Sequence, residues 1–530
     1  MRRLVVTLAI AAACTLATPI AAYAAGPHGI AGLDTTPPAG SGVTPPAEFG
    51  ASWDDPRTAA PPVDKPATRS CSVQIIDHKF AGWDPYLSSY QPPADCAGPW
   101  AKVVLRLDGA VAGRQYDRLG WLAIGGVTVF KTSTPEPSAA GIHWSVEKDV
   151  TGYAPLLRGT QPVSMFLGNT VDGTYTGVLD VQVTLTFYTA DRRHPAPARP
   201  ASDVIPLGGA ATSGADLTGT LTVPRNTERL VAEVYATGSG GGCEEFWYLT
   251  SPASTGYSCP GDSPYREVQV LLDGKVAGIA APFPHVYTGG WSNPFLWYVL
   301  PAPRAFDVKP LTYDLSPYLG LLTDGRAHQV AVHVVGVPAG EPGWDTPVDF
   351  LGWRDRGSAR VTGGLLTDHL GDLTDQVTAG GTSKVTTHAA HEFDAIGYLR
   401  TSHGIVTTAV RERLGDDSTH TWGGEPDENP DTLHAAWTDD SWSIWDGTVS
   451  HQDSRYAIDG SIAVSADNRL TTTITITDAG LGYDDTYRGE AAYNLGVARD
   501  QRHAVGTSQE TYHSPGYQRT IRTSNGFVVN

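Results

Sequence analysis

Two acidic segments of the sequence combine residue types that could hydrolyse a sugar derivative. The first is the polar stretch Gly113-Arg-Gln-Tyr-Asp-Arg118, in which Asp117 stands between a tyrosine and an arginine. In the second, Glu244 and Glu245 stand between a glycine-rich stretch and the aromatic residues 246–248. Adjacent like charges and apolar surroundings both raise a carboxyl pKa. One carboxylate would activate water, the other would donate a proton or hold the substrate, and the rings would stack on sugar faces. For either segment alone, the alternative is an ordinary loop ion pair.

Motifs of other enzyme classes are missing or weak. The chain has no Gly-x-Ser-x-Gly elbow, no phosphate-binding glycine loop and no His-Glu-x-x-His. His388 and His391 stand beside Glu392, but in the wrong order for a metalloprotease, and we expect a surface loop there. The acidic stretch Glu425–Asp431 could hold calcium, although a solvated loop is the favoured interpretation. We therefore predict no metal site.

The charge balance bounds the partners of this protein. Lys and Arg number 37 against 56 Asp and Glu, a net charge of −19. A chain of that charge lacks the basic field that dominates nucleic-acid affinity, and anionic membrane surfaces would repel it. The sequence therefore argues against nucleic-acid partners.

The N-terminus has the pattern of a secretory signal peptide. Arg2 and Arg3 precede an apolar run from Leu4 to about Ile20, and Ala22-Tyr23-Ala24 has the small-x-small form of a cleavage site. We expect residues 1–24 to be removed, no insertion into a membrane, and a secreted, extracellular protein. A lipoprotein modified at Cys14 is the less favoured alternative.

Four cysteines then remain, namely Cys71, Cys96, Cys243 and Cys259. An even number in an exported protein indicates disulfides, and four cysteines allow three connectivities. We favour the two local pairs, Cys71–Cys96 and Cys243–Cys259, with one free pair as the alternative. A catalytic thiol or a zinc cluster does not fit this pattern.

Period-two alternation predicts an all-β chain. In Val178–Tyr188, apolar residues at every second position alternate with polar ones, the pattern of a strand with one buried face. Comparable runs occur at Lys102–Leu107, Trp121–Phe130, Leu230–Tyr235, Val268–Leu272, Gln329–Val335 and Thr471–Thr477. Many short strands with frequent turns are typical of β-sandwiches and jelly rolls.

A weak internal repeat suggests how the strands are organised. The pattern Asp149–Tyr153, a Leu-Leu pair, a turn and a strand recurs from Asp314–Tyr318 onward. We predict a Pro/Gly/Ala-rich flexible linker at 25–66, two jelly-roll sandwiches side by side at 67–195 and 196–357, and a C-terminal β-rich domain at 358–530. Each acidic segment follows an early strand of its own repeat, so the two could meet where the sandwiches touch.

At these residues the sequence resembles the acidic peptide:N-glycanases of plant and fungal type, the PNGase A family. The resemblance covers about residues 65–350 and is loose beyond them. It is carried, in order, by Lys65–Cys71, Gly113–Arg118, Gly141–Asp149, Phe166–Asn169, Thr174–Gly177, Glu245–Tyr248, Arg266–Val268, Tyr287–Gly290, Asn293-Pro294 and Asp314–Leu319.

The resemblance implies hydrolysis of the amide between an asparagine side chain and the first N-acetylglucosamine of an N-glycan. The peptide would be left with aspartate, and the glycan would leave as a glycosylamine. N-glycosylated peptides and glycoproteins would be the substrates, at acidic pH and with tolerance of core α1,3-fucose. No metal or organic cofactor is needed for this reaction.

A fainter similarity to the flavobacterial PNGase F family points to individual residues. Tyr116-Asp117-Arg118 and Cys243-Glu244-Glu245 resemble its two acid motifs, whereas its third acid falls near Asn169, where this chain has no carboxylate. Asn169 or Asp172 is left as a candidate for that role. The family is built of two eight-stranded jelly rolls with a cleft between them.

We assign Asp117 to the scissile amide and Glu245 to water or the first sugar, with Glu244 as the fallback. In a strand, these two neighbouring glutamates would point to opposite faces, with Glu245 toward the substrate and Glu244 outward or against the Cys243 loop. We therefore expect Glu244→Gln to keep most activity and to change the free energy of unfolding by only about 1 kcal/mol. The candidate substrate-binding residues are Arg118, Asn169, Trp247, Tyr248, Trp291 and Trp144. Core packing is an equal alternative for the rings, and the favoured one for Trp144.

Two other functions stay open on the residues alone. A secreted carbohydrate-binding β-sandwich protein without catalysis would keep the aromatic residues while its carboxylates served only structure. A glycoside hydrolase is the third candidate, and it would leave N-acetylglucosamine on the peptide.

Overall fold

The computed structural model describes residues 52–213, 216–238, 243–249, 263–286, 298–341, 344–381, 383–423, 429–497 and 505–529. Within these ranges nearly all regular structure is antiparallel sheet, which confirms the prediction of an all-β chain. None of the helices found in the described ranges has the length and apolar character needed to span a membrane.

The strands between residues 70 and 189 form two four-stranded sheets that pack face to face, in the orders β1-β8-β3-β6 and β2-β7-β4-β5. Their bounds are β1 Ser70–Phe80, β2 Tyr86–Tyr90, β3 Trp100–Val111, β4 Leu119–Ile124, β5 Val127–Ser133, β6 Ile142–Asp149, β7 Gln161–Leu167 and β8 Leu179–Thr189. Short 3₁₀ turns lie between them at η1 Ala94–Cys96, η2 Thr151–Tyr153 and η3 Leu156–Arg158.

One predicted strand of this first sandwich is divided in two. Trp121–Phe130 reads as a single apolar run, but β4 and β5 form a hairpin that turns at Gly125 and Gly126, which have φ of +61° and +83°. Only glycine enters such a conformation without steric cost, so this Gly-Gly pair ends one strand and begins the next.

A second sandwich follows, with sheets in the orders β10-β11-β17-β14-β15 and β16-β12-β19-β9, and a short β13-β18 pair. Its strands are β9 Asp203–Pro206, β10 Gly208–Ser213, β11 Asp216–Leu221, β12 Thr227–Val234, β13 Thr237–Gly238, β14 Glu267–Leu272, β15 Lys275–Ala280, β16 Leu311–Asp314, β17 His328–Val335, β18 Trp344–Asp345 and β19 Val348–Arg354. Its helical turns are η4 Cys243–Phe246, η7 Ser316–Tyr318 and α1 Leu319–Leu322. Both copies of the repeat share one local structure, in which helical turns lead from β6 to β7 and from β16 to β17.

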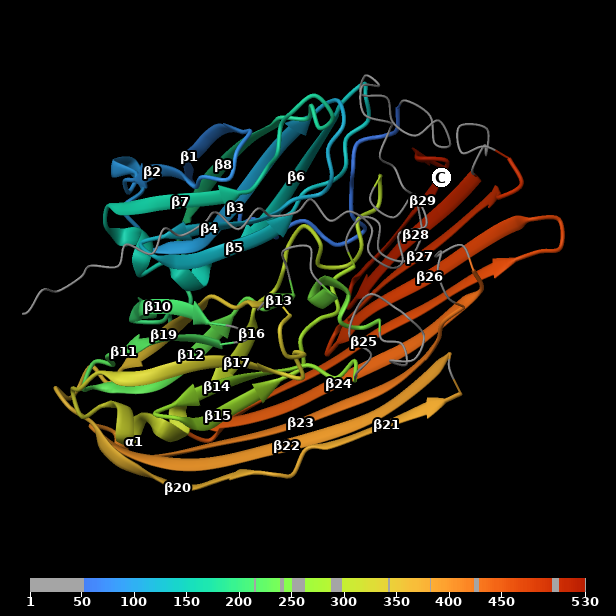
Figure 1. Ribbon diagram of the computed structural model, residues 1–530. Coiled ribbons are helices and arrows are strands. Elements are labelled where there is room, and N and C mark those ends of the chain that lie inside the picture. Colours follow the sequence, from blue (N-terminus) through green and yellow to red (C-terminus); the bar gives the residue numbers. More distant parts are fainter. Residues whose placement is uncertain are drawn as a thin grey trace, which may run out of the picture.

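The remaining strands build one long sheet that curves along the second sandwich (Figure 1). They are β20 Thr362–Leu370, β21 Thr374–Gly380, β22 Lys384–Thr401, β23 Gly404–Thr421, β24 Asp431–Trp445, β25 Thr448–Val464, β26 Arg469–Gly480, β27 Tyr483–Asn494, β28 Val505–Ser514, β29 Tyr517–Ser524 and β30 Phe527–Val528. Along β22 every second residue is buried, so one face of the sheet packs inward.

The prediction of a flexible linker at 25–66 is wrong for residues 53–59, which pack against the second sandwich and this long sheet. Trp53 stacks on Tyr298 with ring centroids 4.0 Å apart, and it is 7% exposed. The backbone N–H of Ala59 donates to Glu510 Oε2 at 2.7 Å. Buried aromatic packing and a charge-assisted hydrogen bond hold this segment in place despite its proline-rich composition.

Buried carboxyl groups join the units of the fold by accepting backbone N–H groups. Asp349 accepts from Thr128 of the first sandwich at 2.8 Å. Glu412 of β23 accepts from Ile279 at 2.7 Å, and Asp439 of β24 accepts from Ala281 at 3.0 Å. Burial raises the pKa of Asp349 to about 8 and that of Asp439 to about 7, and it raises the pKa of Glu412 well above its ordinary value.

These junctions predict a protein that is more stable in acid than at neutral pH. A carboxyl group with a raised pKa binds its proton more tightly in the folded state than in the unfolded chain, so the unfolding free energy falls as pH rises from about 4 through 8. We expect the melting temperature to fall by roughly 5 °C or more between pH 5 and pH 8. Calorimetry at constant ionic strength measures it.

Asp349→Asn supplies the control, since the amide can still accept from Thr128 but does not titrate. Its melting temperature should depend less steeply on pH than that of the wild type. A wild-type melting temperature that rises toward pH 8 would contradict the prediction.

Candidate active site

Asp117 lies in the loop between β3 and β4, and Gln115 anchors that loop. The Gln115 amide nitrogen donates to the backbone oxygens of Thr170 and Gly177 at 2.9 and 3.1 Å. Its Oε1 accepts from Arg118 Nη2. These bonds fix residues 113–118 against the loop 170–177. A polar segment without strand structure needs such anchoring if it is to hold a catalytic side chain in place.

The surroundings of Asp117 are rich in buried positive charge. Arg114 and Arg118 are 8% and 7% exposed, whereas Asp117 is half-buried. The Arg114 guanidinium lies 5.5 Å from the centroid of the Tyr175 ring, which is 5.3 Å from the ring of Tyr116. Two guanidinium groups beside one carboxylate can hold that carboxylate ionised and stabilise an oxyanion that forms next to it.

Sequence reasoning missed a second carboxyl group at this place, that of Glu136. Burial and the negative charge of Asp117 raise the pKa of Glu136 well above its ordinary value, although Arg114 and Arg118 act to lower it. The available signal was Pro135-Glu136-Pro137, an acid between two prolines directly after an apolar strand.

The candidates for a third acid serve structure instead. Asn169 is fully buried, and its amide donates to the backbone oxygens of Phe80 and Gly177, both at 3.0 Å. A side chain without exposed surface does not reach a substrate, so its assignment as a substrate-binding residue is wrong. Asp172 is exposed and accepts the backbone N–H groups of residues 174 and 175, which lower its pKa and close a turn.

Glu244 forms a buried ion pair. Arg266 Nε and Nη2 donate to its two carboxylate oxygens at 2.8 and 2.7 Å, and the Trp344 indole N–H donates at 2.8 Å. The Glu244 and Arg266 side chains are 2% and 3% exposed. The expected outward orientation is therefore wrong, and we now expect Glu244→Gln to cost more than about 1 kcal/mol, because removing one partner would leave a buried charge unpaired.

Glu245 is half-buried, and both glutamates lie in the 3₁₀ turn η4 rather than in a strand. With three residues per turn, neighbouring side chains point about 120° apart, so strand alternation does not apply here. The role of Glu245 in holding water or the first sugar stays a prediction.

Both acidic segments lie beside the contact between the sandwiches. At the end of β5, the Ser133 N–H donates to Ala305 O at 2.9 Å, and the next residue, Thr134, bonds to Arg118. On the same strand, Lys131 Nζ is 2.7 Å from Asp345, the neighbour of the Trp344 that binds Glu244. Strand β5 therefore connects the two segments across the interface.

The aromatic residues assigned to sugar stacking are mostly in the core. Trp247 is 4% exposed and packs against Trp344 and Trp437, Tyr248 is 2% exposed, and Trp144 is 4% exposed. The Trp144 ring fills the space over Gly109, where a Cβ atom would come within 2.3 Å of it. Their burial favours the core-packing alternative, which was already the favoured one for Trp144, and Trp291 lies outside the described residues.

One predicted disulfide is present, between Cys71 of β1 and Cys96 of η1. Cys243 is also disulfide-bonded, while Cys259 lies outside the described residues.

The prediction of a surface loop around His388 and His391 is wrong, because both residues belong to strand β22. His391 points inward, where its Nδ1 is 2.7 Å from Glu267 Oε2. Most of the stretch Glu425–Asp431 lies outside the described residues, but Asp431 Oδ1 is 2.9 Å from His420 Nε2.

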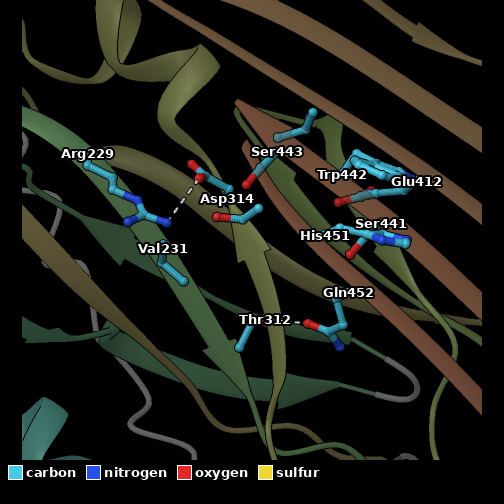
Figure 2. Close-up of a pocket in the computed structure, with 12 residues that line it drawn as sticks. Arg229, Val231, Thr312, Asp314, Glu412, Ser441, Trp442, Ser443, His451 and Gln452 are labelled. Carbon is cyan, nitrogen blue, oxygen red and sulfur yellow. Dashed lines mark hydrogen bonds and ion pairs between the residues drawn. The ribbon is translucent and has the colours of Figure 1, made fainter. Parts of the chain in front are cut away.

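A polar cavity of about 200 Å³ lies away from these segments, between β12 and β16 of the second sandwich and strands β23–β25 (Figure 2). Arg229 and Asp314 form an ion pair of 3.6 Å in it. Trp442 and His451 are among the residues that line it, and their rings stack with centroids 3.7 Å apart.

Comparison with known proteins places both acidic segments within one family. Residues 57–347, more than half of the chain, match the family model described as Peptide N-acetyl-beta-D-glucosaminyl asparaginase amidase A. The chain belongs to this family. Peptide-N4-(N-acetyl-beta-glucosaminyl)asparagine amidase A of Prunus dulcis is 31% identical over an alignment of 381 residues, which covers 66% of this chain and 66% of that one.

Solved structures similar to this member of the amidase A family include PNGase F of Flavobacterium meningosepticum, with 13% identity and a TM-score of 0.35 over 54% of this chain and 96% of that one. PNGF-II has 13% identity and a TM-score of 0.38, over 54% and 66% of the two chains.

Proposed function

We propose that the protein is a glycoamidase that hydrolyses the amide between an asparagine side chain and the first N-acetylglucosamine of an N-glycan. The observation that carries the proposal is the family match over 57–347, which spans Asp117, Glu244 and Glu245 together with both sandwiches. Asparagine is converted to aspartate, and the intact glycan leaves as a glycosylamine.

The site offers the groups that this amide hydrolysis requires. Asp117 removes a proton from the attacking water, and the buried guanidinium groups of Arg114 and Arg118 stabilise the negative charge on the amide oxygen. Glu245 holds the water or the first sugar. Each of these charges acts strongly because the segment is largely withdrawn from solvent.

Mass spectrometry of a treated glycopeptide tests the proposal. At about pH 5, the peptide should lose its whole glycan and gain the mass change of one Asn→Asp conversion. A peptide that keeps one N-acetylglucosamine would indicate a glycosidase instead, and binding without turnover would indicate a carbohydrate-binding protein.

The substrate class suggests action outside the cell, and we propose that the protein is exported. The signal-like residues 1–24 and the Cys71–Cys96 disulfide support this, since disulfides form and persist in oxidising compartments. Fractionation of a host that expresses the full chain should recover the protein outside the cytoplasm, and retention there would count against export.

A further inference from the structure

Glu136 is brought to Asp117 by the hairpin of β4 and β5. The register pairs Leu119 with Ser133. It continues one residue further, because the Thr134 N–H donates to Arg118 O and the Arg118 N–H donates to Thr134 Oγ1, both at 2.9 Å. Two residues beyond Thr134, Glu136 therefore runs alongside residues 116 and 117.

The groups that face Glu136 are Asp117 and the two guanidinium groups of the same loop, Arg114 and Arg118. The Arg118 side chain carries a further sign of an incomplete site. It is 7% exposed, and its buried Nε finds no hydrogen-bond acceptor within the described part of the chain. Buried donors are nearly always paired, so this N–H marks a place where the hydrogen bonding of the segment is incomplete.

We propose that Glu136 is the proton donor of the reaction and that Asp117 is its base. The inference rests on the proposed function. As Asp117 takes a proton from water, the water oxygen bonds to the side-chain carbonyl carbon. The bond from this carbon to nitrogen then breaks, and Glu136 gives its proton to the departing nitrogen. Transfer of the proton from Asp117 to Glu136 restores the pair for the next turnover.

Two adjacent carboxyl groups suit this division of work. Close carboxylates do not both ionise readily, so one of them keeps its proton at a pH at which an isolated glutamate has lost it. The raised pKa of Glu136 favours it as the protonated member, which is the state a proton donor needs. Both carboxyl groups act on the charge of Arg118.

The test compares Glu136→Gln with the wild type on one glycopeptide between pH 4 and pH 8. Wild-type kcat/KM should fall as pH rises through the raised pKa of Glu136. The glutamine variant should lose about 10²–10⁴-fold at the optimum and also lose that alkaline limb, because glutamine has no proton to give. Glu136→Asp, which keeps a carboxyl group, should retain the limb at a lower rate. Glu490→Gln, at an exposed position of β27, is the matched control.

The outcomes separate the two proposals. A wild type that releases no glycan overturns the proposed function itself. An active wild type with a Glu136→Gln variant that keeps the alkaline limb overturns the role of Glu136 alone. If glutamine prevents folding, the Glu136→Asp profile decides, and a missing alkaline limb in that variant counts against the proposal.

Discussion

Asp117→Asn should abolish glycan release while the protein remains folded. Asparagine keeps the shape of the side chain but cannot take a proton from water, and loss of a catalytic acid or base lowers the rate by about 10²–10⁴-fold. Arg118 keeps its bond to Gln115 and Arg114 keeps its contact with the Tyr175 ring, so the loop should persist. Rates of release from one glycopeptide, measured at the wild-type pH optimum, give the result.

Asp108→Asn is the matched control for this substitution, because Asp108 lies on β3 with a side chain that is 50% exposed. It should keep wild-type turnover. An Asp117→Asn variant with normal melting temperature and near-normal activity would remove Asp117 from the mechanism.

Glu244→Gln should have the largest effect on stability among the acidic residues of the site. The substitution leaves the Arg266 guanidinium buried without its bidentate carboxylate. Breaking a buried pair in this way costs about 3–5 kcal/mol. At roughly 2–4 °C per kcal/mol, the melting temperature should fall by about 6–20 °C.

The neighbouring Glu245→Gln is the control for stability and the contrast for activity. The Glu245 side chain is half-buried, so we expect the free energy of unfolding of this variant to lie within about 1 kcal/mol of the wild-type value. It should nevertheless lose most of its activity, whereas folded Glu244→Gln should keep most. Equal melting temperatures for the two variants would show that the buried ion pair does not contribute as described.

Two of these groups show why neighbouring acids of one chain differ in role. The Glu244 carboxylate accepts hydrogen bonds from the Arg266 guanidinium and the Trp344 indole, so its charge stabilises the folded structure. Burial and a neighbouring carboxyl group raise the pKa of Glu136 well above its ordinary value. The groups that contact a carboxyl side chain, rather than its residue type, decide whether it stabilises the fold through an ion pair or can donate a proton.

The alternation of apolar and polar residues was sufficient to predict strands of the first sandwich, but much less so for the long C-terminal sheet. In β8, Val181, Val183 and Leu185 alternate with polar residues, which marks one buried face in any context. In β22 the buried positions include Thr387, Ala389 and His391. Of these, His391 pairs with Glu267 of the second sandwich, so the apolar periodicity that reveals a strand is diluted there.

The sequence by itself determined the all-β class, several strands of the sandwiches and the segments that identify the family, because each depends on residues that are neighbours in the chain. It favoured the Cys71–Cys96 pair, which the structure confirms. Only the tertiary structure decided which acids meet and which rings are buried. The β4–β5 hairpin places the segments that carry Asp117 and Glu136 near each other, where the charge of Asp117 acts on Glu136, and Glu244 pairs with Arg266 and Trp344 of distant segments. Charge and burial depend on these distant neighbours, so the chemistry of each carboxyl group is settled by packing rather than by its local sequence.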